Sequence, residues 1–173
     1  MAKLRGLTIA LCILFIALSS SAEPTQDAQN PVEDPLDMQQ IHHRLSVQYF
    51  NQVWTIIDKQ KRSAEETEDM ILLAYASLWH WRQRRDVRPL NLSIGYWQVS
   101  RVHALAGQYE MAKLFADKCL QVSTQGELTP FYMGYAYEAL TRAEILSQDS
   151  DAAKAYLMKA EQQLGKVKDQ EEM

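Results

Sequence analysis

Cysteine, glycine and proline are scarce in this chain of 173 residues, which contains two, six and five of them. One cysteine, Cys12, lies in an apolar N-terminal run, so a chain without that run would keep only Cys119 and could form no internal disulfide. Three of the five prolines fall between residues 23 and 35. The rest of the chain has few residues that interrupt regular structure and lacks the alternating apolar and polar pattern of strands. These absences predict an all-α fold.

Recognisable catalytic and metal-binding motifs are also lacking. The chain has no glycine-rich phosphate loop, no nucleophile elbow and no histidine-glutamate zinc motif. His42 and His43 are adjacent and would face apart on a helix, while His103 and Cys119 lack the spacing of metal ligands. We therefore expect no enzyme activity, no cofactor and no metal site. Cys119 falls on an apolar helix face, which predicts a buried structural thiol.

Basic residues are outnumbered by acidic ones, 18 to 22, which gives a net charge of −4. Two of the basic residues, Lys3 and Arg5, belong to the N-terminal segment that we expect to be removed. Without them the net charge is −6, because residues 1–22 contain no acidic side chain. An acidic surface argues against nucleic acid and anionic membranes as partners.

The N-terminal segment has the features of a secretory signal peptide. A basic start is followed by an apolar run from Gly6 to Leu18 and by small residues up to Ala22. We expect residues 1–22 to be cleaved after Ala22, because the run is shorter than the ~20 apolar residues of a spanning helix. This predicts a periplasmic or secreted protein with no stable membrane span. Residues 23–35, rich in proline and acidic side chains, are predicted to be a disordered linker.

The remaining residues show the periodicity of six helices. Ser63, with Glu66 three residues later, has the spacing of a capping box at a helix start. The predicted helical domain covers residues 36–165, and a charged flexible tail is expected at 166–173. The six predicted helices cover residues 36–60, 63–85, 92–106, 109–123, 130–147 and 150–165.

The segment from Ala104 to Leu120 resembles the turn and second helix of a tetratricopeptide repeat. Gly107 permits a sharp turn, and the small Ala112 and Ala116 stand where two helices must approach closely. The pattern recurs 41 positions later, where Ala153 aligns with Ala112; the repeat of this family is ~34 residues long. The resemblance implies about three antiparallel helical hairpins stacked as a short right-handed superhelix. It also implies a scaffold that binds a protein or peptide in a concave groove.

Further strings extend this resemblance over most of the predicted domain and are similar to a group of uncharacterised bacterial tetratricopeptide-like proteins. That second similarity supports the fold and implies no activity. The strings are those at residues 50–54, 76–81, 97–102 and 136–143.

In the resembled family the first helix of each hairpin lines the groove. Transferred to this chain, that register implies a binding surface of Trp97, Arg101, Tyr135, Glu138 and Arg142. Two guanidinium groups suit the capture of a carboxylate. A purely structural role is the alternative, since Glu138 and Arg142 can pair on one helix and Arg101 can stack on Trp97, one turn away.

A second candidate centre is the string Trp79-His80-Trp81. A histidine among aromatic residues could act as a base, and Asn51 and Trp54 are candidates for the same pocket. An enzymatic or small-molecule pocket around His80, Arg101 and Glu138 is therefore an alternative function, and a core histidine with one hydrogen-bonded nitrogen is the structural alternative. A third interpretation is a self-associating module that forms a homodimer.

Overall fold

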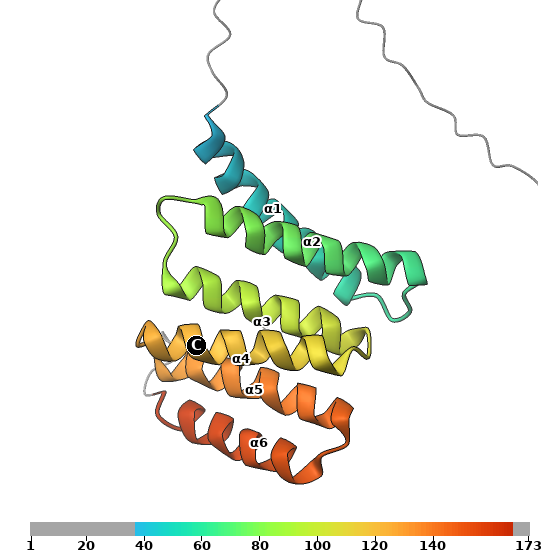
Figure 1. The fold of residues 1–173 in the computed structure, drawn as a ribbon, viewed down its shortest axis with the longest axis vertical. Coiled ribbons are helices and arrows are strands. Elements are labelled where there is room, and N and C mark those ends of the chain that lie inside the picture. Colours follow the sequence, from blue (N-terminus) through green and yellow to red (C-terminus); the bar gives the residue numbers. More distant parts are fainter. Residues whose placement is uncertain (1–36, 168–173) are drawn as a thin grey trace, which may run out of the picture. The chain divides into compact units, whose positions relative to one another are not determined.

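The computed structural model describes residues 37–167, and these form six helices with no strand among them (Figure 1). The predicted all-α fold is confirmed. The expected signal peptide 1–22, the linker 23–35 and residues 168–173 of the expected tail lie outside the described residues. The helices are α1 (Met38–Ile57), α2 (Ala64–Gln83), α3 (Pro89–Leu105), α4 (Tyr109–Gln125), α5 (Pro130–Ser147) and α6 (Ser150–Leu164).

Capping residues set the helix boundaries. The capping box is present at the start of α2, where Ser63 accepts from the Glu66 amide at 3.0 Å and Glu66 accepts from the Ser63 amide at 2.8 Å. The third helix begins at Pro89, three residues before its predicted start, because proline has no amide hydrogen to leave unpaired in a first turn. Gly107, between α3 and α4, has a φ of +72°, which glycine adopts without strain.

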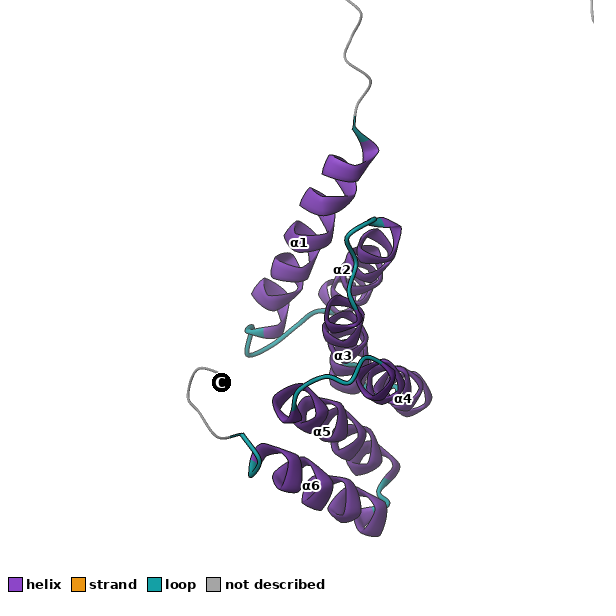
Figure 2. Ribbon diagram, turned by 90° about the vertical axis from the view of Figure 1, so that its left-hand side faces the viewer, coloured by secondary structure: helices purple, strands orange, loops and turns teal. Residues whose placement is uncertain are grey.

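Each helix packs against the next one in the chain, and α3 also contacts α5. Figure 2 shows α1 and α5 on the same side of α3. The largest cluster of buried apolar side chains joins α1, α2, α3 and α4 through residues that include Val53, Met70, Val99 and Phe115. This packing brings the middle of α3 into contact with both α1 and α5.

Small residues allow the helices of the C-terminal half to approach closely. Ala112 of α4 is fully buried with Ala104 of α3 and Ala143 of α5. Ala116 is buried with Ala139 and Leu140. The predicted role of Ala112 and Ala116 as close-packing positions is therefore confirmed by their burial.

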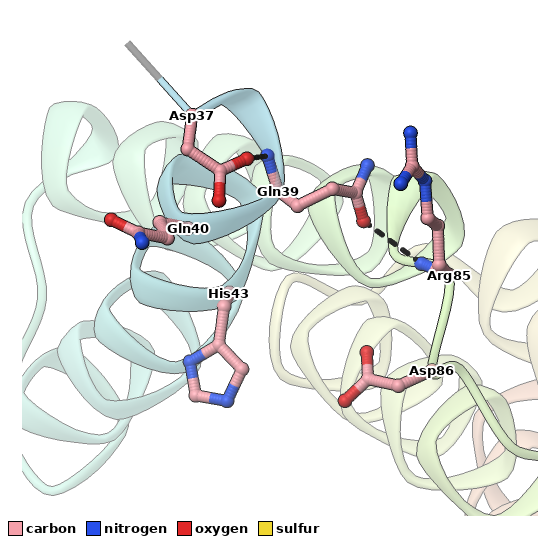
Figure 3. A pocket seen from close by; sticks show the side chains of 6 residues that line it. All are labelled: Asp37, Gln39, Gln40, His43, Arg85 and Asp86. Carbon is pink, nitrogen blue, oxygen red and sulfur yellow. Dashed lines mark hydrogen bonds between the residues drawn. The ribbon is translucent and has the colours of Figure 1, made fainter. Parts of the chain in front are cut away.

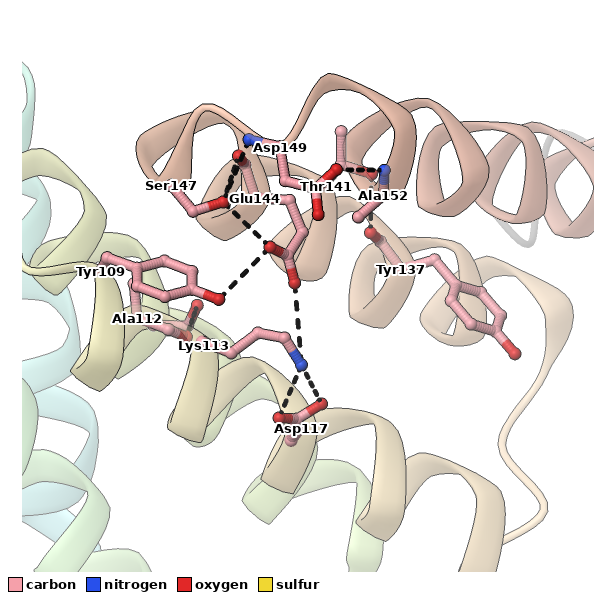
Figure 4. Close-up of polar contacts among 11 residues, drawn as sticks. Tyr109, Ala112, Lys113, Asp117, Tyr137, Thr141, Glu144, Ser147, Asp149 and Ala152 are labelled. Carbon is pink, nitrogen blue, oxygen red and sulfur yellow. Dashed lines mark hydrogen bonds and ion pairs between the residues drawn. The ribbon is translucent and has the colours of Figure 1, made fainter.

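The buried carboxylate of Glu144 links α5 to α4 through polar contacts. Glu144 of α5 accepts hydrogen bonds from the Tyr109 hydroxyl at 3.3 Å and the Ser147 hydroxyl at 3.1 Å (Figure 4). Its other oxygen lies 3.8 Å from Lys113 Nζ, which also pairs with Asp117. Because every oxygen of Glu144 has a partner, its burial is compatible with a purely structural role.

The N-terminal half of α1 is attached to α2 differently from the C-terminal half. The apolar residues of α1 that join the core cluster begin at Val53. Before that point the buried residues are polar, His42 and Ser46. The carbonyl oxygen of Ser46 accepts from the Ser77 hydroxyl at 2.7 Å. Polar contacts therefore hold the first turns of α1.

None of the six described helices is both long enough and apolar enough to span a membrane.

Candidate functional site

The five residues expected to form a binding surface on the third and fifth helices lie close together in the structure. Trp97 and Arg101 come from α3, while Tyr135, Glu138 and Arg142 come from α5. The Trp97 indole Nε1 donates to Glu138 Oε2 at 3.0 Å, and the rings of Trp97 and Tyr135 meet edge to face with centroids 5.5 Å apart. Glu138 and Tyr135 of α5 both contact Trp97, so Trp97 lies at the centre of these residues.

Glu138 has its charge balanced by Arg142. The Arg142 Nε donates to Glu138 Oε1 at 3.0 Å, and the Arg142 Nη2 pairs with Glu138 Oε2. This is the intrahelical ion pair expected from their four-residue spacing. The guanidinium carbon of Arg142 also lies 5.6 Å from the Trp97 ring centroid. The pair and the indole therefore form one connected unit.

Arg101 is positioned by aromatic rings alone. Its guanidinium carbon lies 5.5 Å from the ring centroids of both Trp54 on α1 and Trp97 on α3. Within residues 37–167 its guanidinium makes no hydrogen bond or ion pair, and its Nε is buried without a partner. Burial, and then repulsion from Arg142, lower the pKa of Arg101 from its usual value. The surface thus holds one guanidinium whose charge no neighbouring acid neutralises directly.

An aromatic pocket opens beside this arginine. Its volume is about 290 Å³. Trp54 and Trp97 form part of its wall, so the pocket and Arg101 share two rings. The other lining residues come from α3 and α5: Ser93, Ile94, Phe131, Tyr132 and Tyr135.

The residues of the second predicted pocket, Asn51, Trp54 and His80, do not lie together. Trp54 joins the aromatic pocket, where its ring centroid lies 5.9 Å from that of Trp97. Asn51 is exposed on α1. His80 makes its ring contacts with other residues, and among the described residues no hydrogen bond joins it to Asn51, Arg101 or Glu138.

His80 is paired with a second histidine. The Nδ1 atoms of His80 on α2 and His42 on α1 lie 2.8 Å apart, so one ring donates to the other. Tyr49 and Trp79 contact the same imidazole. Burial, and then the nearby His42, lower the pKa of His80 from its usual value. With one nitrogen in this bond, His80 has the hydrogen bond of the structural alternative stated for it, although its side chain is partly exposed and not in the core.

A second hollow, of about 440 Å³, lies where α1 begins and α2 ends (Figure 3). The Gln39 side chain lies at one side of the hollow and accepts a hydrogen bond from the Arg85 amide at 3.0 Å. The carboxylate of Asp86 is bound by Arg84, which lowers the pKa of Asp86 to about 2. The side chains here are exposed or already paired, so this hollow is a weaker candidate than the aromatic pocket.

Metal chemistry has no support in the described part of the chain. Among residues 37–167 no three His, Cys, Asp or Glu side chains gather in a way that could hold an ion. Cys119 is buried, as predicted, and burial raises its pKa to about 11. Its sulfur lies 3.5 Å from the Ser93 hydroxyl.

Sequence reasoning missed four residues of the aromatic pocket, which are Ser93, Ile94, Phe131 and Tyr132. It also considered His42, the partner of His80, only as a metal ligand. A signal for two of them was present, since Ile94 precedes Trp97 by three residues and Phe131 precedes Tyr135 by four, which places each on the same helix face as its neighbour.

No family model matches the chain, and no curated protein or solved structure matches it either.

Proposed function

We propose that this protein is an exported tetratricopeptide-like scaffold that binds a protein or peptide partner through the surface built from α1, α3 and α5. In this proposal the six helices stack as three hairpins of a short right-handed superhelix, and α1, α3 and α5 line its concave groove. The protein acts in the periplasm or outside the cell. Its partner contributes a carboxylate, from an acidic side chain or a chain end, that binds Arg101.

The observation that carries this proposal is the state of Arg101. A guanidinium offers five N–H donors, and a buried donor without a partner costs free energy. Arg101 is half-buried between two indoles, yet it makes no hydrogen bond to a described residue. A carboxylate bound there would neutralise the charge and satisfy donors, and the two rings already hold the guanidinium in place for it.

The charges around Arg101 favour an anionic ligand. Arg142 neutralises Glu138, so the group of Arg101, Arg142 and Glu138 keeps one net positive charge, and the nearby Asp58 offsets part of it without a hydrogen bond or ion pair to Arg101. The protein as a whole is acidic, with a net charge of −4. A local positive site on an acidic protein directs a carboxylate to one place and disfavours broad contact with polyanions.

The geometry gives less support to an enzyme. A general base must lie within hydrogen-bond reach of the group that it deprotonates. His80 is bonded to His42 and makes no hydrogen bond to Arg101 or Glu138. Glu138 is already bonded to Trp97 and Arg142. A binding surface therefore accounts for these contacts better than a catalytic pocket does.

Affinity capture with a matched pair of variants tests the proposal. Arg101→Gln removes the free guanidinium and keeps the first three carbons of the side chain with a neutral polar end. Arg82→Gln removes an exposed arginine from α2 and serves as the control for net charge. We expect a cell-envelope partner to be retained by the wild-type protein and by Arg82→Gln but not by Arg101→Gln. Equal retention by all three proteins would reject the proposed surface.

A further inference from the structure

We propose that the aromatic pocket beside Arg101 receives one aromatic side chain of the bound segment, directly next to the residue whose carboxylate contacts Arg101. This inference rests on the proposed function and adds a second recognition element to it. The ligand class becomes a peptide segment with an aromatic and an acidic residue adjacent in sequence.

The pocket is small but has room for an aromatic side chain. Sites that enclose whole drug-sized ligands measure roughly 300–1,000 Å³. At about 290 Å³ the aromatic pocket lies at the lower limit of that range. It can therefore hold one ring, and it is small for a longer stretch of chain.

The pocket lining favours a ring over an aliphatic group. Five of its seven lining residues are aromatic, and they come from three helices. Phe131 and Tyr135 meet edge to face with centroids 5.0 Å apart, and Tyr135 meets Trp97 in the same manner at 5.5 Å. Ring faces and edges both border the space, and another ring can use both kinds of contact.

The Ser93 hydroxyl in the pocket wall is already hydrogen-bonded. The Ser93 hydroxyl lies 2.7 Å from the Ser123 hydroxyl, and both side chains are buried. The pocket thus presents no free polar group from Ser93 that would require a polar ligand. Tyr135, in contrast, is 41% exposed and can adjust as a ring enters.

The spacing between the two recognition elements follows from Trp97 and Trp54. Both rings line the pocket, and both lie 5.5 Å from the guanidinium carbon of Arg101. Neighbouring residues are about 3.8 Å apart at Cα, and where the bound backbone turns instead of running extended, their side chains can lie on one side, so adjacent residues can reach both places. A guanidinium this close to the rings also disfavours a cationic ligand in the pocket, which leaves a neutral ring as the occupant.

Defined peptides test this inference with the purified chain. The probes are acetylated and amidated tetrapeptides in which glycines flank Phe-Asp, Leu-Asp, Ala-Asp or Phe-Asn, together with the reversed order Asp-Phe. Tryptophan fluorescence reports binding, because Trp54 and Trp97 line the pocket. Each peptide is titrated against wild type, Tyr135→Ala and Arg101→Gln. Leu157→Ala on α6, where Leu157 is 45% exposed, is the control.

We expect the Phe-Asp pair, in one of its two orders, to bind at least about 10-fold more tightly than Ala-Asp and measurably more tightly than Leu-Asp. Tyr135→Ala should remove the preference for the ring, and Leu157→Ala should keep it. If phenylalanine, leucine and alanine peptides bind equally and all depend on Arg101, the aromatic pocket is rejected and the proposed function stands. If no peptide binds, or if Arg101→Gln binds them as wild type does, both are rejected.

Discussion

Trp97 and Glu138 are joined by a 3.0 Å hydrogen bond from the indole Nε1 to Oε2, which links α3 to α5. The same carboxylate accepts from Arg142, so its charge is balanced before any ligand is bound. Arg101 lies against the rings of Trp54 and Trp97 and forms no ion pair with a described residue. One interhelical bond therefore joins α3 to α5 at this surface, next to the guanidinium that we propose binds a carboxylate.

Replacing Trp97 by phenylalanine tests the structural value of this bond. The variant keeps a ring in contact with Arg101 and Tyr135 but removes the donor to Glu138. We expect the free energy of unfolding to fall by about 1 kcal/mol, below the roughly 1.5–3 kcal/mol of hydrogen bonds to charged groups, because Glu138 is partly exposed. Urea denaturation measures the change. Trp79→Phe, at a position 53% exposed, is the control and should change it much less.

The close approach of α3, α4 and α5 predicts a cost for a larger side chain at Ala112. This residue is fully buried against Ala104 and Ala143. We expect Ala112→Leu to lower the free energy of unfolding by about 1–3 kcal/mol through overpacking. The same substitution at the exposed Ala155 of α6 should leave stability within about 0.5 kcal/mol of wild type. Equal effects at the two positions, in thermal or urea unfolding, would contradict the packing.

Cys119 is expected to resist alkylation in the folded protein. Burial raises its pKa to about 11, so very little thiolate exists at pH 8, and the surrounding helices block access. Iodoacetamide should react at least about 100-fold more slowly than with the same protein in denaturant, as followed by intact mass. Fast labelling under native conditions would show that this part of α4 opens readily.

The paired imidazoles predict a local response to acid. The pKa of His80 is lowered in the folded protein, so the unfolded state binds protons first as the pH falls below about 6.5. Stability is therefore lost as the pH falls from about 6.5 towards the lower pKa of the folded state. The loss should be greatest in the first turns of α1, because polar contacts such as the His42–His80 bond hold them.

Amide hydrogen exchange at pH 7 and pH 5, corrected for intrinsic rates, measures this response. Protection of residues 40–48 should fall at pH 5 in the wild-type protein. His80→Gln should abolish the pH dependence, whereas His43→Gln, at an exposed neighbouring position, should preserve it. An unchanged exchange pattern between the two pH values would show that the His42–His80 pair does not determine the stability of the first turns of α1.

Patterns local to one segment were predictable from the sequence. The capping box of Ser63 and Glu66, the start of α5 at Pro130 and the turn at Gly107 each depend on residues a few positions apart. The sequence prediction began this helix at residue 92 and missed its start at Pro89, although proline is well suited to a first turn. Helical periodicity thus gave the type and order of the elements and was less accurate at their ends.

Contacts between distant segments were predictable only where the register of the resembled repeat related one helix to another. The resemblance to a helical repeat related α3 to α5, and the structure does bring Trp97 together with Glu138. No such register related α1 to α2, so the bond between His42 and His80 was missed. Trp54 was assigned to the neighbourhood of His80 for the same reason, and its ring contacts Trp97 and Arg101. Periodicity shows which residues share a helix face but not what that face meets.

Site-directed photo-crosslinking in living cells tests the central claim most directly. A benzophenone amino acid is placed at Tyr135, beside the pocket, or at Leu157 on α6, which is similarly exposed. The account predicts an adduct with a partner from Tyr135 only, and its loss when Arg101→Gln is added to the same chain. Adducts that form equally from both positions, or that persist without Arg101, would contradict a partner-binding surface centred on this arginine.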